Sequence, residues 1–408
     1  MQEIKYHSYF TGRGDAPRQY PWMSLDEDCE IVIAGGGIAG CAAAYELSEA
    51  GIDVVLLSQK PIGFSSTPVN SSALSFANDF LLAKLSKTVG KDHAVRCFTL
   101  CGEALDELER FSAESEPDFC FRRRDAFLYV TSAEQADEIH TEYLMRKHNG
   151  FPAEFLERQE AGERFSFDVQ AGILAKDAGG ETDGYLLCHA LCRATRKNGA
   201  RIYENTAVVA AENTEGGVQV TTGHERVVQA KKLLLANGWR QKDSLPAAIG
   251  KRSLFTVVSE PVTSFSGYES RALIKNAETG ISLRTTADDR ILAWNHGSSL
   301  PESEGKLSRF FPSEKLARKK YGELAYSMRE MLCGIRGIRA EYAYCGAYGT
   351  TRDGLPVIGE HPDYDNVYFD MPSGKNGILF SLIGGKLLAE LYHGEEGDEL
   401  FSPTRPTI

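Results

Sequence analysis

The stretch EIVIAGGGIAGCAAAYELSEAGIDVVLL, residues 30–57, decides the fold. Its first part, Glu30 to Ala34, is an apolar β-branched run typical of a strand buried on both faces. Residues 35–40 then match the pattern G-x-G-x-x-G, and residues 41–50 have the composition of a helix that ends at Gly51. A second apolar run completes the stretch. We therefore predict two parallel strands joined by a right-handed helical crossover.

The glycine hexapeptide predicts a dinucleotide site in this context. Gly35 permits the tight turn, Gly37 lets the backbone approach a pyrophosphate, and Gly40 lets the helix pack closely on the sheet. Ile38 and Ala39 open the helix, whose free N–H groups and partial positive charge favour a diphosphate. The hexapeptide alone would equally suit a glycine-rich packing turn, so the prediction depends on the flanking strand and helix.

The end of the second predicted strand departs from the usual dinucleotide fingerprint. An acid for the adenosine ribose hydroxyls is expected there, but Leu57 is followed by Ser58, Gln59 and Lys60. Ser58 or Gln59 can still hydrogen-bond a hydroxyl, without the assistance of a charge. We expect this departure to affect cofactor affinity rather than the fold.

Composition places the chain among ordinary globular proteins. Its 408 residues, 42% of them hydrophobic, suggest about two to three domains. A net charge of −12 argues against a nonspecific nucleic-acid partner. The longest apolar stretch, Ile31 to Ala44, is too short for a transmembrane segment. The start has no signal-peptide pattern, and the nine cysteines are scattered without metal-ligand spacing, so we expect a cytoplasmic protein with reduced thiols and no metal site.

Further hydrophobic patterns indicate an α/β fold, in which a Rossmann-like domain is interleaved with a second α+β domain built on a largely antiparallel sheet. Helices are expected over 78–114, 133–147, 186–198, 314–333 and 377–392, and strands over 125–131, 200–203, 207–212, 217–222, 226–229 and 231–236. The expected boundaries are 1–80, 154–250 and 345–408 for the nucleotide-binding domain, and 81–153 and 251–344 for the substrate domain.

The end of the chain carries a second strand–glycine turn–helix unit. Residues 351–359 (TRDGLPVIG) precede a predicted strand at 367–370, and SGKNG at 373–377 opens the last helix. This unit resembles the C-terminal signature of the FAD-dependent amino-acid and amine oxidoreductase family, which includes D-amino acid oxidase, sarcosine oxidase and glycine oxidase. An NAD-dependent Rossmann enzyme would not need it. The resemblance extends over nearly the whole chain, through residues 31–40, 63–74, 233–239 (LLLANGW) and 283–286 (LRTT).

The resemblance implies an enzyme that uses FAD to oxidise the C–N bond of a small amine or amino acid to an imine, with oxygen or another acceptor taking the electrons. A flavin-dependent hydroxy-acid dehydrogenase and a flavin-binding protein without turnover remain alternatives. The residues that the resemblance assigns to FAD are Gly35, Gly37, Ile38, Ala39, Gly40, Ser58, Gln59, Ser65, Ser66, Thr67, Val208, Val209, Gly238, Asp353, Gly374, Lys375, Asn376 and Gly377.

The resemblance also bears on how the flavin is held. Some sarcosine oxidases attach it to a cysteine seven residues before the aspartate that corresponds to Asp353. That position is Gly346 here, and Cys345 is one residue away. Because successive side chains of a strand point to opposite faces, Cys345 is expected to face away from the flavin. We therefore expect noncovalent FAD.

Three residues are candidates for contact with substrate or the reacting flavin. Arg284 lies where relatives often place an arginine that binds a carboxylate, a role that suits its planar fork, although a surface ion pair with a nearby aspartate would also explain it. His296 either lines the substrate pocket or is a packed core histidine. Lys375 either adds positive charge at the flavin or is a solvated surface lysine. No general acid or base is evident, because the flavin itself accepts the hydride.

Overall fold

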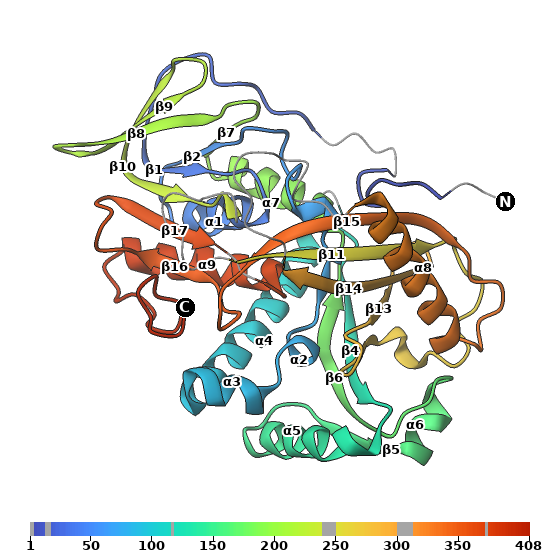
Figure 1. Ribbon diagram of the computed structural model, residues 1–408. Coiled ribbons are helices and arrows are strands. Elements are labelled where there is room, and N and C mark those ends of the chain that lie inside the picture. The colour runs from blue at the N-terminus through green and yellow to red at the C-terminus, as the bar shows by residue number, and fades with distance from the viewer. Residues whose placement is uncertain (1–3, 13–17, 116–117, 239–249, 300–312, 372–373) are drawn as a thin grey trace.

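The structure is a computed structural model that describes residues 4–12, 18–115, 118–238, 250–299, 313–371 and 374–408. Two sheets dominate it, and Figure 1 shows them side by side, with helices packed around them. The first sheet has the order β16-β17-β10-β1-β2-β7, and the β8–β9 hairpin extends from its strand β10. The second has the order β15-β11-β14-β13-β12-β4-β6-β3, with β5 on β6.

The first sheet contains the predicted nucleotide-binding unit. Its strands β1, β2, β7, β10 and β17 are parallel, whereas β16 runs antiparallel at the edge. These strands are β1 (Glu27–Ala34), β2 (Val54–Leu57), β7 (Arg201–Tyr203), β8 (Val208–Thr214), β9 (Gly217–Thr222), β10 (Val227–Leu235), β16 (Val357–Glu360) and β17 (Val367–Met371). One face packs on helices α1 (Ile38–Glu49), α7 (Gly184–Lys197) and α9 (Gly377–Tyr392). The runs 226–229 and 231–236, predicted as separate strands, form the single strand β10.

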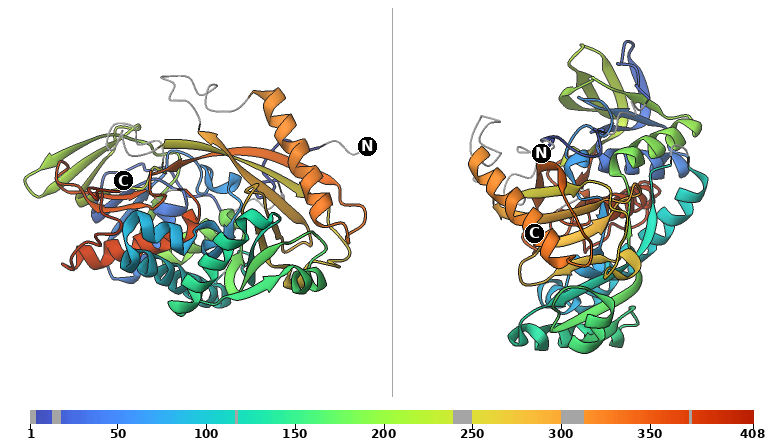
Figure 2. Two further views of the ribbon diagram at one scale, coloured as in Figure 1. Left: turned by 60° about the horizontal axis from the view of Figure 1, so that its bottom comes forward. Right: turned by 90° about the vertical axis from the view of Figure 1, so that its right-hand side faces the viewer.

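The second sheet is largely antiparallel, as predicted, with β12 and β4 as its parallel pair among the described strands. Its strands are β3 (Ala73–Leu74), β4 (Arg122–Val130), β5 (Glu154–Glu157), β6 (Ala171–Glu181), β11 (Gly250–Ser259), β12 (Leu273–Asn276), β13 (Ser282–Thr285), β14 (Ile291–Ser299) and β15 (Ala340–Thr350). Figure 2 shows α8 (Glu314–Met331) lying across these strands, far from the β8–β9 hairpin. The α/β fold class with two interleaved units is thus confirmed.

The sheets divide the chain differently from the expected boundaries. Strands β3, β5 and β6 fall within 1–80 and 154–250, yet they belong to the second sheet, because β6 pairs along its length with β4. The stretch 78–114, predicted as mainly helical, breaks into three helices, since Phe80 is extended and Gly90 has a φ of 89°. The helices in this part of the chain are α2 (Phe76–Asp79), α3 (Leu82–Val89), α4 (Lys91–Glu114), α5 (Ala136–His148) and α6 (Arg158–Arg164). The domain division itself remains a proposal.

None of the helices in the described ranges is long and apolar enough to cross a membrane.

Candidate active site and cofactor cleft

The turn between β1 and α1 leaves room only for glycine. Gly35 has a φ of +135°, and a Cβ there would lie 2.5 Å from the carbonyl oxygen of Ala236 on the neighbouring segment. A Cβ on Gly40 would lie 1.7 Å from the carbonyl oxygen of Gly35. Helix α1 begins after Gly37 with no side-chain cap and no acid in its first turn. Its N-terminus therefore offers N–H groups and positive partial charge to an anion.

A cleft of about 580 Å³ runs from this turn along the carboxyl ends of the parallel strands. Such ends are where nucleotides bind in open α/β sheets. Thr67 Oγ1 accepts a hydrogen bond of 3.2 Å from Ile38 N and so ties one wall of the cleft to the start of α1. The predicted residues that line this cleft are Gly35, Gly37, Ile38, Ala39, Ser58, Gln59, Ser65, Ser66, Thr67, Val208, Val209 and Gly238. Gly40 lies behind them, against Gly35.

Ser58 occupies the position predicted to face a ribose, but its hydroxyl is already engaged. Its Oγ donates to the carbonyl oxygen of Lys60 at 2.6 Å, and the residue is buried. The hydroxyl hydrogen is thus committed within the protein, and Oγ can only accept a hydrogen bond from a ligand. A shared interaction of this kind is weaker than one with a carboxylate.

A smaller cavity continues from the cleft to the start of α9, and we call it the flavin-end cavity. It shares Ile38, Ser66 and Thr67 with the cleft and is closed by Gly374, Lys375, Asn376 and Gly377. Asn376 has a left-handed backbone, with a φ of 62°. Its Oδ1 accepts from Ser75 N at 2.9 Å, whereas its buried Nδ2 has no partner within the described structure.

The residues along this path fit FAD. The N-termini of α1 and α9, whose N-cap residues make no side-chain cap, both border this space. The glycine cradle accepts a close-lying diphosphate, and the orphaned Asn376 amide supplies a donor where a polar ring edge would lie. Each end of the path thus matches one end of the dinucleotide.

The second sheet walls the flavin-end cavity with large side chains. Leu254 on β11, Trp294 and His296 on β14, and Tyr348 on β15 all line it. His296 Nδ1 and the Tyr348 hydroxyl are hydrogen-bonded at 2.7 Å. Burial and the nearby charge of Lys375 lower the pKa of His296 to about 3, so its ring is neutral at ordinary pH. His296 thus lines a cavity, and its contact with substrate remains a prediction.

A charged cluster, Asp79, Lys275 and Lys375, lies beside His296. Lys275 Nζ is 2.8 Å from Asp79 Oδ1, and their side chains are only 9% and 7% exposed. Ser75 Oγ donates to the other carboxylate oxygen at 2.7 Å. Burial alone would raise the pKa of Asp79, but the charges of Lys275 and Lys375 hold it well below its usual value. The site was expected to contain Lys375 but not the Asp79–Lys275 pair.

The sequence offers one indication that Lys275 has a special environment. Lys275 lies inside the four-residue strand LIKN, and every residue of this strand is buried in the structure. A lysine within such a strand needs a buried partner. The sequence could not identify that partner, because Asp79 is 196 positions away along the chain.

The structure does not place Arg284 where substrate was predicted to bind, because its guanidinium is buried and donates to backbone carbonyls. The residue is 2% exposed and lines neither the cleft nor the flavin-end cavity. It donates to the carbonyl oxygens of Ser71 at 2.7 Å, Thr285 at 3.0 Å and Thr182 at 3.1 Å. Arg284 thereby joins β13 to the loop that borders the flavin-end cavity. The alternative prediction, that Arg284 forms a surface ion pair with a nearby aspartate, is wrong, because the residue is buried.

We expect Arg284→Ala to unfold at a much lower denaturant concentration than the wild type. Charged hydrogen bonds contribute about 1.5–3 kcal/mol each, and three buried carbonyls would lose their donor, so a loss of at least about 3 kcal/mol is expected. Urea unfolding followed by fluorescence measures it. A variant of normal stability with a raised KM for a carboxylate substrate would instead return Arg284 to the substrate site.

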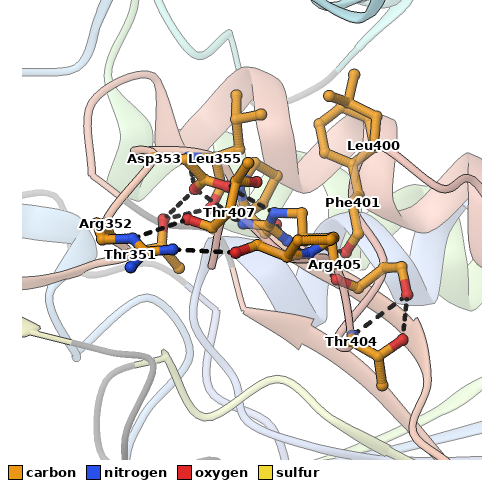
Figure 3. Close-up of polar contacts among 12 residues, drawn as sticks. Thr351, Arg352, Asp353, Leu355, Leu400, Phe401, Thr404, Arg405 and Thr407 are labelled. Atoms are coloured by element: carbon orange, nitrogen blue, oxygen red, sulfur yellow. Dashed lines mark hydrogen bonds and ion pairs between the residues drawn. The ribbon is translucent and has the colours of Figure 1, made fainter. Parts of the chain in front are cut away.

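Asp353 was predicted to contact FAD, but its carboxylate faces the C-terminal tail. Figure 3 shows Arg405 and Thr407 converging on it. Arg405 Nε and Nη2 donate to its two oxygens at 2.7 and 3.0 Å, and Thr407 Oγ1 donates at 2.7 Å. Asp353 lines neither the cleft nor the flavin-end cavity. It acts instead by fixing the turn 351–355, next to Gly374.

The strand parity predicted around Gly346 is present in β15. Cys345 packs with the apolar cluster beneath α8, although this residue also forms part of the cleft lining, and a Cβ on Gly346 would lie 2.7 Å from Val69 Cγ2 in the wall of the cleft. Burial raises the pKa of the Cys345 thiol to about 12, which makes it a poor nucleophile. A noncovalent flavin remains our proposal on these grounds.

Comparison with known proteins agrees with this geometry. Residues 30–391 match the family model described as FAD dependent oxidoreductase (DAO). Gamma-glutamylputrescine oxidoreductase of Escherichia coli is 24% identical over 95% of this chain and 89% of its own length. Glycine oxidase of Bacillus licheniformis is 26% identical over 90% of this chain and 93% of its own.

Solved structures show the same fold. Glycine oxidase from Geobacillus kaustophilus superimposes with a TM-score of 0.72 at 21% identity, covering 93% of this chain and 99% of that one. L-Proline dehydrogenase from P. horikoshii gives a TM-score of 0.75 at 19% identity, covering 93% of this chain and 98% of that one. With its glycine cradle, its second helix N-terminus and a family match over most of its length, the chain belongs to the DAO family of FAD-dependent oxidoreductases.

Proposed function

We propose that this enzyme oxidises the C–N bond of an amino acid or amine to an imine. The observation that carries the proposal is the pocket of Trp294, His296 and Tyr348 at the end of the FAD path. It offers a small molecule a place beside the α9 end of the path, where the reacting ring is expected. The two curated relatives above are named for an amino acid and an amine, and they support this substrate class.

Bound FAD supplies the two-electron acceptor of this reaction. The N-terminus of α9 and the Lys375 ammonium place positive charge where negative charge develops during reduction. Leu254 and Trp294 wall the pocket with apolar surface and exclude water from it.

The pocket selects a neutral amine. Neither His296, which is neutral, nor Tyr348, whose pKa is raised by burial, is a ready base at pH 7. The Lys375 charge repels an ammonium ion. The amine therefore loses its proton to solvent before it binds, and no protein base is required for the hydride step.

We propose further that the reduced flavin is reoxidised by oxygen or by another acceptor, and that the protein is cytoplasmic. The reactivity of the reduced enzyme toward oxygen depends on the pocket and is best measured directly. The location is supported by nine scattered cysteines, which in the structure are all free thiols.

The test is a visible spectrum of the purified protein followed by anaerobic titration. We expect a yellow protein whose FAD is released by acid, and whose absorption is bleached by members of an amine and amino-acid panel. Bleaching by hydroxy acids alone would contradict the C–N assignment. Flavin that precipitates with the polypeptide would contradict the noncovalent link.

A further inference from the structure

Lys375 stands between two cavities. One is the flavin-end cavity, and the other is an outer cavity of about 370 Å³ between α2, α3, α5, β4 and β12. Asp79 and Lys375 line both of them, so the charged cluster forms the partition. Lys275 lines the outer cavity as well.

The charges at this partition do not balance. Lys275 neutralises Asp79, and Ser75 occupies the remaining carboxylate oxygen. Within the described residues, no carboxylate lies at ion-pair distance from Lys375, and His296 contributes no charge. The nearby Arg252 is exposed and adds further positive potential. A half-buried ammonium without a counter-ion is costly, so an anion is expected to complete the site.

We propose that Lys375 binds the carboxylate of the substrate, so that the substrate is an amino acid, N-alkylated or not, rather than an amine without a carboxylate. This rests on the proposed C–N oxidation. With Arg284 engaged by backbone carbonyls, no arginine lines the flavin-end cavity, and Lys375 is the cation that faces it among the described residues. Asp79 and Lys275 are positioning residues, since the pairing of Lys275 with Asp79 leaves Lys375 free for a ligand.

Acetate and acetamide test the proposal, because they have nearly the same shape and differ in charge. Each is titrated into the FAD-bound enzyme, and binding is read from the change in the flavin absorption. Lys375→Met removes the ammonium while keeping an unbranched side chain. We expect it to weaken acetate binding at least tenfold, which is about 1.4 kcal/mol, and to change acetamide binding less than twofold.

Arg252→Met is the matched control. It removes one positive charge from the same neighbourhood, but Arg252 lines neither cavity. A purely long-range field effect would weaken acetate binding equally in both variants and would overturn the proposal. We expect less than a threefold change in Arg252→Met.

A pH series provides an independent readout. Burial and the charge of Lys275 lower the pKa of Lys375 to about 8. Acetate affinity should therefore fall about tenfold per pH unit above that value, because only the protonated ammonium binds the anion. Between pH 7 and 10 the facing groups with shifted pKa values keep their state: Asp79 is ionised because its pKa is lowered, and His296 and Tyr348 are neutral because burial lowers the pKa of the first and raises that of the second. The side chains of Lys275, paired with Asp79, and of Arg252 also lie near Lys375. This dependence should vanish in Lys375→Met.

Two outcomes would overturn the inference while leaving the proposed function intact. One is a wild-type enzyme that is bleached by amines but binds acetate no better than acetamide. The other is a Lys375→Met variant with normal acetate affinity and a lowered flavin reduction potential, which would assign Lys375 to the flavin alone. Conversely, Lys375-dependent acetate binding without bleaching by any amine or amino acid would support the anion site and contradict the C–N chemistry.

Discussion

Gly35→Ala is expected to lose its FAD during purification. The added Cβ would lie 2.5 Å from the Ala236 carbonyl oxygen, and the φ of +135° is one that a residue with a side chain rarely adopts. The turn must then rearrange, and with it the α1 N-terminus that faces the diphosphate. We expect FAD affinity to fall at least a hundredfold, about 2.8 kcal/mol, as measured by fluorescence titration of the apoprotein.

Gly102→Ala provides the control for this experiment. Gly102 lies within α4, and a Cβ there would meet no atom within 4 Å. Alanine at an open helical site should stabilise the protein by up to about 1 kcal/mol and leave FAD affinity unchanged. If Gly35→Ala retained FAD as Gly102→Ala does, the turn would not be the diphosphate site.

Arg405→Ala is expected to be among the most destabilising single changes in the C-terminal tail. The Arg405 and Asp353 side chains are 4% and 0% exposed, and the guanidinium also donates to the carbonyl oxygens of Leu355 and Pro356. Removing one partner leaves a buried, unpaired carboxylate, which typically costs about 3–5 kcal/mol. Thermal and urea unfolding measure the loss. FAD affinity should fall as well, because the Asp353 turn adjoins Gly374.

The acid dependence of stability follows from the same pair. Burial alone would raise the pKa of Asp353, but hydrogen bonds from Arg405 and Thr407 lower it below its usual value. A carboxyl group whose pKa is lower in the folded than in the unfolded protein stabilises the fold at pH values above the unfolded-state pKa. This stabilisation is lost as the pH falls through the folded-state pKa. Arg405→Ala should therefore shift acid unfolding to higher pH.

An ion pair of the same tail whose arginine is exposed serves as the comparison. Arg96 on α4 contacts Asp398 at 2.7 Å; the Arg96 side chain is 54% exposed and the Asp398 side chain 9% exposed. Surface pairs of this kind contribute up to about 1 kcal/mol, so Arg96→Ala should unfold nearly as the wild type does. If Arg96→Ala and Arg405→Ala lowered the free energy of unfolding equally, the effect would come from loosening the C-terminal tail as a whole and not from the buried charge pair.

The cofactor end of the molecule was the more predictable part. The β1–α1–β2 unit and the last helix arise from contiguous residues, in which hydrophobic period and glycine spacing act over short distances. Cys345 was expected to face away from the flavin for the same reason, since strand parity is a local property. The division into domains stays a prediction, because the sequence of a strand does not say which sheet it joins: β6 lies within 154–250, yet it pairs with β4 of the second sheet.

Long-range pairing decided the roles of the charged residues. Nothing near Arg284 in the sequence shows that Ser71 and Thr182 supply its acceptors, or that Arg405, 52 positions away, takes both oxygens of Asp353. The sequence by itself determined the family fold, the two glycine turns and a lysine beside the second of them, because backbone geometry at glycines and helix starts is set locally. Only the tertiary structure decided which charged side chains stabilise the fold through internal partners and that Lys375 lines the pocket. The physical reason is that the partner of a charge is the group that folding brings within a few ångströms of it, wherever that group lies in the sequence.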